Sequence, residues 1–265
     1  MGMNGRNVHE LFLSENQKRL TREFFVTDAL ELSRRLIGKI MVHETPLGKV
    51  RGIITETEAY MGVEDKGSHT YGGRRTERTE PMFHIGGTSY VYFIYGMYNC
   101  VNVTAGAEGT PMAALIRMVE PADEASRSIM ERLRMADMER RRAARKKRKA
   151  ECMADSGETA AAGTAAMKEG IAAAAKEIHA VGTETFAATE KVPTAIKKHR
   201  ADGPGKLCIA MHITKADNDI DMAESREFYL TEGIEVKESR ILTGKRIGID
   251  YAEEAADYLW RFTLT

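Results

Sequence analysis

The sequence of 265 residues predicts a mixed α/β fold of the α+β class. Two hairpin signals, over residues 39–60 and 88–104, place paired strands next to one another along the chain. An amphipathic helix pattern over residues 28–37 precedes the first hairpin. Because hairpins join antiparallel strands, this pattern argues against the regular β-α-β alternation of a parallel sheet.

The first part of the chain supplies most of the predicted sheet. Thr27 or Asp28 can cap the first helix, whose apolar positions recur at roughly helical spacing: Ala29, Leu30, Leu32, Leu36 and Ile37. Residues 39–43 form the first predicted strand and residues 50–60 its hairpin partner. Residues 64–81 are rich in glycine and arginine and predict a long polar loop, and loops of this length are usually functional or disordered.

Further strands are expected along the rest of the chain. Residues 88–104 are rich in β-branched and aromatic residues around Gly96, which predicts two strands or one bent pair. Residues 113–120 predict another strand, and residues 123–150 one long helix with a basic end. Residues 151–200 have few large apolar groups, so weak helix at the periphery is expected there. Short strands are expected at residues 207–213, 246–251 and 258–264.

Composition excludes several classes of protein. The mean hydropathy is −0.38, and no apolar run approaches the roughly 18 residues of a membrane span. The start of the chain lacks the apolar block of a signal peptide. The three cysteines are scattered, without a disulfide framework or a zinc-site spacing, so we expect a reducing cytosol. The 39 basic and 39 acidic residues cancel, but this sum speaks against a nucleic-acid partner only if the charges are evenly spread.

The most informative stretch covers residues 54–69. On a strand, Glu56, Glu58 and Tyr60 project to one face, since side chains alternate with period two. Two carboxylates and a phenol, followed by a loop with His69, are groups suited to general-base chemistry. Two other interpretations stay open. One is a solvated sheet face, and the other is a metal site of Glu56, Glu58, Asp65 and His69, whose spacing is not diagnostic.

Aromatic side chains crowd residues 90–102. Alternation puts Tyr90 and Tyr92 on one face, with Phe93 and Tyr95 on the other until Gly96 bends the chain. A plain β core is one interpretation, and for Phe93 it is the better one. A buried tyrosine hydroxyl needs a partner, however, and tyrosines beside an arginine-rich loop are what stacking on nucleobases requires.

Six motifs follow one another along the chain: ETEAYMG at 56–62, EDKGSHTYGGRRTERTEPMF at 64–83, GTSYVYFIYGMYNCVNV at 87–103, LIRMVEP at 115–121, GPGKLCIAM at 203–211 and RIGIDYA at 246–252. In these motifs the sequence resembles the alkyladenine (3-methyladenine, or methylpurine) DNA glycosylases of the AAG/MPG type. The resemblance covers most of residues 20–121 and 203–262, in the family's order and spacing. It implies a single domain with a curved, largely antiparallel β-sheet and peripheral helices.

The resemblance implies roles for the residues around the predicted site. Glu58 matches the general base that activates water for attack on C1′ of an extruded nucleotide. Tyr60 and Tyr92 match the aromatics that sandwich the extruded base, and His69 matches the residue opposite them that reads the purine edge. Asn102 matches the pocket residue that disfavours unmodified guanine.

The resemblance also implies contacts to DNA. Tyr95 matches the side chain that intercalates into the duplex in place of the flipped nucleotide. Arg117 matches a residue that helps hold the flipped nucleotide through its backbone. The loop arginines expected to approach phosphates are Arg74, Arg75 and Arg78.

The implied reaction is hydrolysis of the N-glycosidic bond of alkylated purines, which leaves an abasic site in base-excision repair. The family pattern places no lysine as a Schiff-base nucleophile, so strand cleavage is not implied. The implied substrates are 3-methyladenine and 7-methylguanine, with hypoxanthine and ethenoadenine as further candidates. No cofactor is implied.

Two features depart from the family pattern. Family members usually continue past the Trp-Arg-Phe segment with a Gly-Pro-aromatic tail, whereas this sequence stops at Thr265, so a shortened closing edge is expected. Residues 122–200 form a low-complexity, basic and Ala-rich helical insertion within the one domain of residues 1–265. Residues 140–149 hold eight basic residues in ten. This run is interpreted either as a solvated helix face or as a tether that adds phosphate contacts, so attraction to DNA would be local.

Functions of other classes stay open at this point. A non-catalytic module that binds damaged DNA would keep the tyrosines and arginines without depending on Glu58. A metal-dependent phosphoesterase would use Glu56, Glu58 and His69 as ligands. We expect a monomer that binds double-stranded DNA with damaged purines, without metal or membrane, in the bacterial cytoplasm at the nucleoid.

Overall fold

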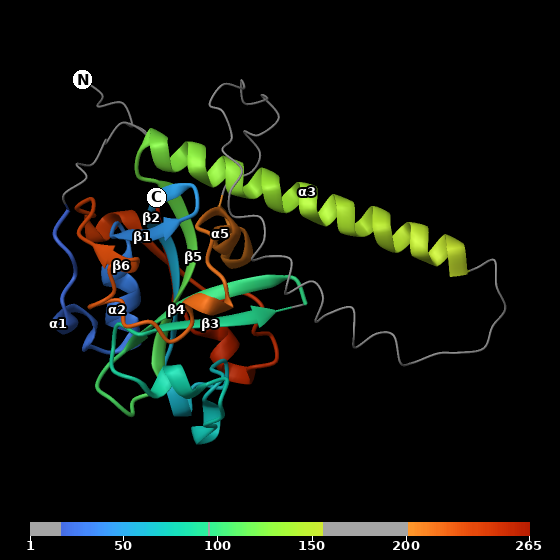
Figure 1. The fold of residues 1–265 in the computed structure, drawn as a ribbon. Helices are drawn as coiled ribbons and strands as arrows, with labels where there is room; N and C mark the ends of the chain where they lie inside the picture. The colour runs from blue at the N-terminus through green and yellow to red at the C-terminus, as the bar shows by residue number, and fades with distance from the viewer. Residues whose placement is uncertain (1–16, 95, 156–200) are drawn as a thin grey trace, which may run out of the picture. The chain divides into compact units, whose positions relative to one another are not determined.

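The computed structural model describes residues 17–94, 96–155 and 201–265 (Figure 1). Contacts divide the chain into two units, residues 1–134 with 198–265, and residues 135–197. The first unit contains the sheet and the short helices. Helix α3 (Glu124–Asp155) begins in the first unit and ends in the second.

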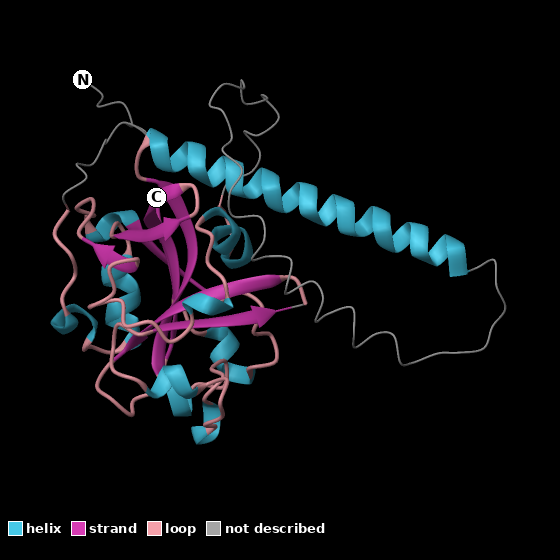
Figure 2. Cartoon of the chain, in the orientation of Figure 1, coloured by secondary structure: helices cyan, strands magenta, loops and turns pink. Residues whose placement is uncertain are grey.

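An eight-stranded sheet is the framework of the first unit, and every pairing described in it is antiparallel. The order is β3-β4-β5-β2-β1-β6, and β8 pairs with both β2 and β7. The sheet curls, as Figure 2 shows, which confirms the expected curved antiparallel sheet. The strands are β1 (Ile40–Thr45), β2 (Gly48–Tyr60), β3 (Ser89–Ile94), β4 (Tyr98–Ala105), β5 (Met112–Pro121), β6 (Phe228–Thr231), β7 (Ile241–Gly244) and β8 (Arg261–Leu264).

Strand β2 lies inside the sheet and is paired along both edges. One edge pairs with β5, and the other pairs first with β1 and then with β8. The register against β5 shifts between Ile54 and Thr57. An irregularity of this kind re-aims the side chains that follow it, and such irregularities are frequent next to active sites. The paired edges hold the second half of β2 firmly in place.

The first unit also has three short helices, α1 (Arg22–Phe25), α2 (Ala29–Leu36) and α5 (Pro204–Ala210), of which α2 and α5 pack on the sheet. The Asp28 carboxylate caps α2 by accepting a hydrogen bond from the Glu31 N–H at 2.9 Å. Leu32 and Leu36 of α2 are completely buried against β2 and β5, and each contributes roughly 1.5–3 kcal/mol by leaving water. Helix α5 packs on β4 and β5.

Most predicted elements are confirmed, including the capped helix α2, the β1–β2 hairpin, the β3–β4 pair around Gly96, and β5. The long helix is confirmed as α3. The long polar loop contains short 3₁₀ turns: η2 (Gly62–Glu64), η3 (Tyr71–Gly73) and η4 (Glu80–Phe83). None of the described helices is long and apolar enough to cross a membrane.

Two of the predicted short strands are wrong. Residues 207–213 belong mainly to helix α5, because Pro204 sits in its first turn, where a missing N–H costs nothing. Residues 246–251 form no strand, since Gly248 adopts φ +80° and turns the chain. Strand β8 begins at Arg261 rather than at residue 258. The weak helix expected at 151–200 lies mostly outside the described residues, and α1, β6 and β7 were not predicted.

Candidate active site

The second half of β2 carries the carboxylates of the candidate site. Glu58 is completely buried and the Tyr60 hydroxyl donates to its Oε2 at 3.0 Å. Arg117, on β5, joins both acids: its Nε lies 2.9 Å from Glu56 Oε1 and its Nη1 lies 3.1 Å from Glu58 Oε1. The predicted common face of Glu56, Glu58 and Tyr60 is therefore confirmed.

The protonation of Glu58 is set by opposing effects. Burial raises the pKa of its carboxyl above the usual value, and the nearby Glu56 acts in the same direction. The Arg117 charge, the Ile247 N–H and the Tyr60 hydroxyl lower the pKa, since each stabilises the carboxylate. The Ile247 N–H donates to Oε1 at 2.8 Å. The result is a carboxylate that is desolvated yet held by three donors, which suits a general base.

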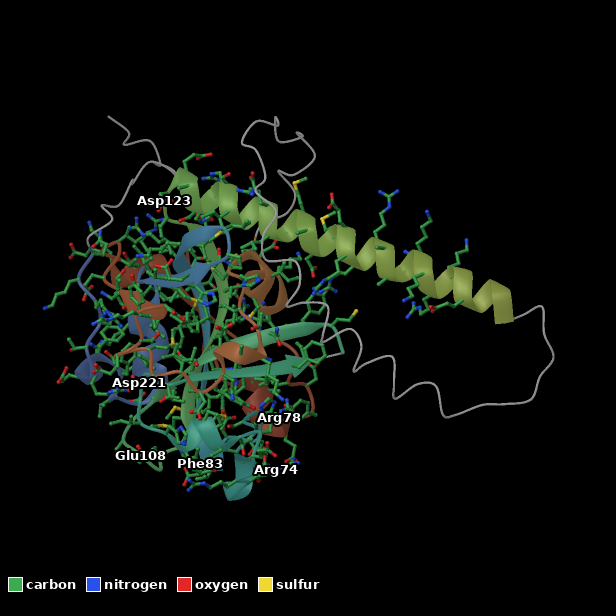
Figure 3. All side chains as sticks on the ribbon, viewed as in Figure 1. Arg74, Arg78, Phe83, Glu108, Asp123 and Asp221 are labelled. Atoms are coloured by element: carbon green, nitrogen blue, oxygen red, sulfur yellow. The ribbon has the colours of Figure 1, made fainter. Side chains whose placement is uncertain are left out.

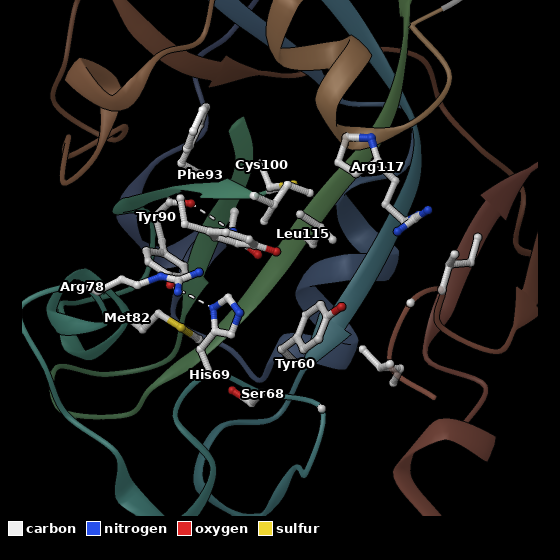
Figure 4. A pocket seen from close by; sticks show the side chains of 18 of the residues that line it. Tyr60, Ser68, His69, Arg78, Met82, Tyr90, Phe93, Cys100, Leu115 and Arg117 are labelled. Atoms are coloured by element: carbon white, nitrogen blue, oxygen red, sulfur yellow. Dashed lines mark hydrogen bonds between the residues drawn. The ribbon is translucent and has the colours of Figure 1, made fainter. Parts of the chain in front are cut away.

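The three residues that hold this carboxylate, Tyr60, Arg117 and Ile247, line a cavity of about 390 Å³, and Glu58 itself lies behind them (Figure 4). This volume is within the range of roughly 300–1,000 Å³ that small-ligand pockets occupy. Aromatic side chains from β2 and β3 and the polar loop at 64–81 surround it. Its lining includes Tyr60, Ser68, His69, Arg78, Met82, Tyr90, Tyr92, Phe93, Ile94, Cys100, Asn102, Leu115, Arg117, Pro204, Ile247, Ile249 and Tyr251.

The tyrosines of β3 lie on one face, as alternation predicts, but the β-core interpretation of Phe93 is wrong, because this side chain is 56% exposed. The ring centroids of Tyr90 and Tyr92 are 5.2 Å apart. The ring of His69 meets Tyr92 edge-on at 4.6 Å, and its Nδ1 lies 2.9 Å from the Tyr90 hydroxyl. Asn102 of β4 is buried, and its Nδ2 donates to the Tyr90 carbonyl at 3.0 Å. Aromatic rings and polar groups from β3, β4 and the loop at 64–81 thus meet at the cavity.

His69 is a neutral ring at physiological pH. Burial lowers the pKa of His69 to about 4, and the charges of Arg78 and Arg74 act in the same direction. A neutral imidazole can donate from one nitrogen and accept at the other. Such a ring can therefore form hydrogen bonds with a ligand in the cavity without repelling a cationic one.

The loop arginines have different surroundings. All three are exposed, and Arg74 and Arg78 are labelled in Figure 3. Arg75 pairs with Glu80 at 2.5 Å and lies over the Phe83 ring. Arg78 lies 5.4 Å from the Tyr92 ring centroid and lines the cavity. A second hollow of about 450 Å³ shares His69 and Arg78 with it and adds Arg74 and Lys66, among others. Tyr95 lies outside the described residues.

Sequence reasoning missed the support behind the site. Arg246 and Asp65 form an ion pair that is completely buried, with N–O distances of 2.5 and 2.7 Å. The Arg246 guanidinium also lies 4.8 Å from the Tyr60 ring centroid, and the next residue supplies the Ile247 N–H that holds Glu58. The signal in the sequence that could have indicated this buried ion pair was Arg246, a charged residue in the predicted strand at 246–251.

The carboxylates do not gather as metal ligands. Within the described ranges 17–94, 96–155 and 201–265, no group of three or more His, Cys, Asp or Glu side chains is arranged to hold a metal ion. Glu58 is paired with Arg117 and Asp65 with Arg246 instead. The geometry gives no support to the alternative of a metal-dependent phosphoesterase.

Comparison with known proteins decides the family, because a model of the methylpurine-DNA glycosylases matches residues 23–265. The chain belongs to the methylpurine-DNA glycosylase family. A relative named "Putative 3-methyladenine DNA glycosylase" from Clostridium novyi (strain NT) is 38% identical over 245 residues, 92% of this chain and 94% of the relative. One with the same name from Clostridium botulinum (strain Alaska E43 / Type E3) is 37% identical over 243 residues, with the same coverage. As a member of this family the chain is a monofunctional DNA glycosylase of base-excision repair.

Proposed function

We propose that this methylpurine-DNA glycosylase flips an alkylated purine nucleotide out of duplex DNA and hydrolyses its N-glycosidic bond, with Glu58 as the general base. The observation that carries the proposal is a buried carboxylate whose three donors, Tyr60, Arg117 and Ile247, all line an aromatic cavity. A base inside a duplex is out of reach of such a cavity, so the nucleotide must leave the stack.

The proposed chemistry balances with water alone. Glu58 accepts a proton from a water molecule whose oxygen bonds to C1′. The bond between C1′ and the base nitrogen breaks, and its electron pair leaves with the base. For 3-methyladenine this pair neutralises the positive charge of the alkylated ring. The lining of the cavity contains no lysine, which agrees with hydrolysis rather than a Schiff-base route.

The proposed base pocket consists of Tyr60, His69, Tyr92 and Asn102. Tyr60 and the edge-on pair of Tyr92 and His69 offer aromatic surface to the base, since all line the same cavity. Asn102 lies at its wall, where it would crowd the exocyclic amine of guanine. The substrates proposed on this basis are 3-methyladenine and 7-methylguanine, with hypoxanthine and ethenoadenine as further ones.

DNA contacts are proposed for five further residues. Arg74 and Arg78 are exposed cations beside the cavity, and Arg75, although paired with Glu80, is exposed too. A guanidinium has five N–H donors, and Arg117 gives those on Nε and Nη1 to carboxylates, so donors remain for a nucleotide phosphate. Tyr95 is proposed to fill the gap in the stack.

The test is release of bases from defined duplexes by wild-type enzyme and by Glu58→Gln. The wild type should release 3-methyladenine and the variant should lose release by 100-fold or more, on the order of what one catalytic acid or base supplies. The variant should still bind the alkylated duplex. Glu64→Gln changes an exposed acid that does not line the cavity, so this variant serves as control and should keep full activity.

Two outcomes would contradict the proposal. If the wild type releases no damaged base but binds alkylated duplex in preference to undamaged duplex, the chain is a damaged-DNA-binding module. If Glu58→Gln releases 3-methyladenine at the wild-type rate, another group activates the water. Release of hypoxanthine, ethenoadenine and 7-methylguanine in the same assay defines the range of substrates.

The cytoplasm of a bacterial cell is the proposed location, with the chain acting as a monomer.

A further inference from the structure

The second half of α3 carries a charge run that the proposed active site does not use. Residues 140–149 lie on one unbroken helix and hold eight Lys or Arg residues, with Ala143 and Ala144 as the other two. All ten except Arg141 are exposed. Nitrogen-tipped side chains extend from several sides of this part of α3 in Figure 3. We call residues 140–149 the basic segment.

Only the start of the basic segment is neutralised by its own helix. Asp137 accepts from Arg140 and Arg141, with N–O distances of 2.5 Å. The other six basic side chains form no ion pair with the part of the chain that the structure describes: Arg142, Arg145, Lys146, Lys147, Arg148 and Lys149.

Repulsion between these charges destabilises the helix when no anion is bound to it. At 100° per residue, the eight basic positions are distributed all around the axis, and no apolar stripe remains that a protein core would bury. Three like-charged pairs stand four residues apart: Arg141 with Arg145, Arg142 with Lys146, and Arg145 with Lys149. Each such pair destabilises a helix slightly, because like charges one turn apart repel each other. A polyanion that lies along the helix would remove this repulsion.

The charge density of the basic segment matches that of DNA. Ten helical residues span about 15 Å, so eight charges give about one per 2 Å. Duplex DNA carries one negative charge per about 1.7 Å of its axis. We propose that the basic segment is a second DNA-binding surface, which contacts phosphates of the duplex independently of damage. This inference rests on the proposed function only in taking duplex DNA as the partner.

The consequence is a salt-dependent affinity for undamaged DNA. A cation that neutralises one phosphate contributes about 0.9 to the slope of log K against log salt concentration. Lysine and glutamine have similar helix propensities, so Lys146→Gln/Lys147→Gln/Lys149→Gln removes three charges without breaking α3. The matched control removes three exposed charges from the first unit: Lys215→Gln/Arg226→Gln/Lys237→Gln.

The experiment measures binding of both triple variants and of the wild type to an undamaged duplex, by fluorescence anisotropy, from about 50 to 200 mM salt. We expect the helix variant to bind with a slope smaller by about 2 to 3, and the control variant to keep the wild-type slope. Far-UV circular dichroism confirms equal helix content in the three proteins.

An unchanged slope for the helix variant would overturn the inference, and so would equal losses in both variants, because the effect would then follow net charge alone. A loss seen with single-stranded RNA and absent with duplex DNA would also overturn it and assign the surface to RNA. Base release in a single turnover, at saturating enzyme, should stay at the wild-type rate in the helix variant. A protein that releases no base but shows the slope difference would refute the proposed function and leave this inference standing.

Discussion

Replacing Asp65 by Asn should lower the stability of the protein and should also lower its base-release activity at acidic pH. The Asp65 carboxylate receives two hydrogen bonds from Arg246 inside the protein, where both side chains are 0% exposed. Removing one partner of a buried ion pair costs about 3–5 kcal/mol, because the other charge stays buried and unpaired. At about 2–4 °C per kcal/mol for a chain of this size, the melting temperature should fall by on the order of 10 °C.

The effect on activity follows from the residue after Arg246. The Ile247 N–H donates to the Glu58 carboxylate at 2.8 Å, and the guanidinium of Arg246 also donates to the Ala59 and Ala255 carbonyls. If Arg246 shifts, this donor is lost and the neutral form of Glu58 is favoured. A hydrogen bond to a charged group contributes about 1.5–3 kcal/mol, so activity on the acidic side should fall about 10-fold or more.

The assay is base release in a single turnover at several pH values, together with thermal unfolding. Asp65→Asn should lose activity mainly at low pH and recover towards the wild-type rate as the pH rises and Glu58 ionises. Asp65→Leu combined with Arg246→Leu should regain part of the stability, since no unpaired charge remains, and keep the altered pH profile. A fall in melting temperature with an unchanged profile would show that the pair supports only the fold, and the reasoning about Ile247 would be refuted.

Three further predictions concern protonation and packing. The pKa of His69 in the folded protein is about 4, below its unfolded value near 6.5, so the stability of the fold should decrease as the pH drops from 6.5 towards 4. The stability of His69→Phe should depend less on pH in this window. An equal pH dependence in the variant and the wild type would contradict the lowered pKa of His69. The pKa of His43 is raised, since hydrogen bonds from its ring to Asp217 and to a backbone carbonyl outweigh the effect of burial. The charged ring therefore stabilises the fold below about pH 6.5 and loses this contribution as the pH rises through the raised pKa, so His43→Gln should cost more stability at pH 6 than at pH 8 in urea unfolding. Gly233→Ala should melt at a much lower temperature than the wild type, because a Cβ at residue 233 would lie 2.0 Å from the carbonyl oxygen of Gly38. A melting temperature within a few degrees of the wild type would show that the backbone segments around Gly38 and Gly233 move apart easily.

Local sequence signals predicted the framework of the site well. Asp28 ahead of an apolar helical pattern, and the turn between β1 and β2, are short-range features whose meaning depends little on the rest of the chain. Alternation along β2 and β3 was sufficient to put Glu58 with Tyr60, and Tyr90 with Tyr92, on common faces.

The parts that could not be predicted depend on distant contacts. A four-residue apolar run such as 207–210 has too few positions to distinguish a strand from a helix, and only its packing on β4 and β5 decides. Ile247 acts through its backbone N–H, which every residue type except proline has, so no side chain marks its role. The partner of Arg246 is 181 residues away along the chain.

The buried thiols of Cys100 and Cys208 make the enzyme resistant to alkylation of its own cysteines. Burial raises the pKa of Cys100 to about 11 and raises the pKa of Cys208 well above its ordinary value. At pH 7 about one Cys100 side chain in ten thousand is then a thiolate, the form in which cysteine is nucleophilic. Electrophiles that methylate purines also attack thiolates, and Cys100 lines the cavity where the damaged base would bind. A protein that repairs alkylated DNA thus keeps these two sulfur atoms in their least reactive state while the damaging agent is present.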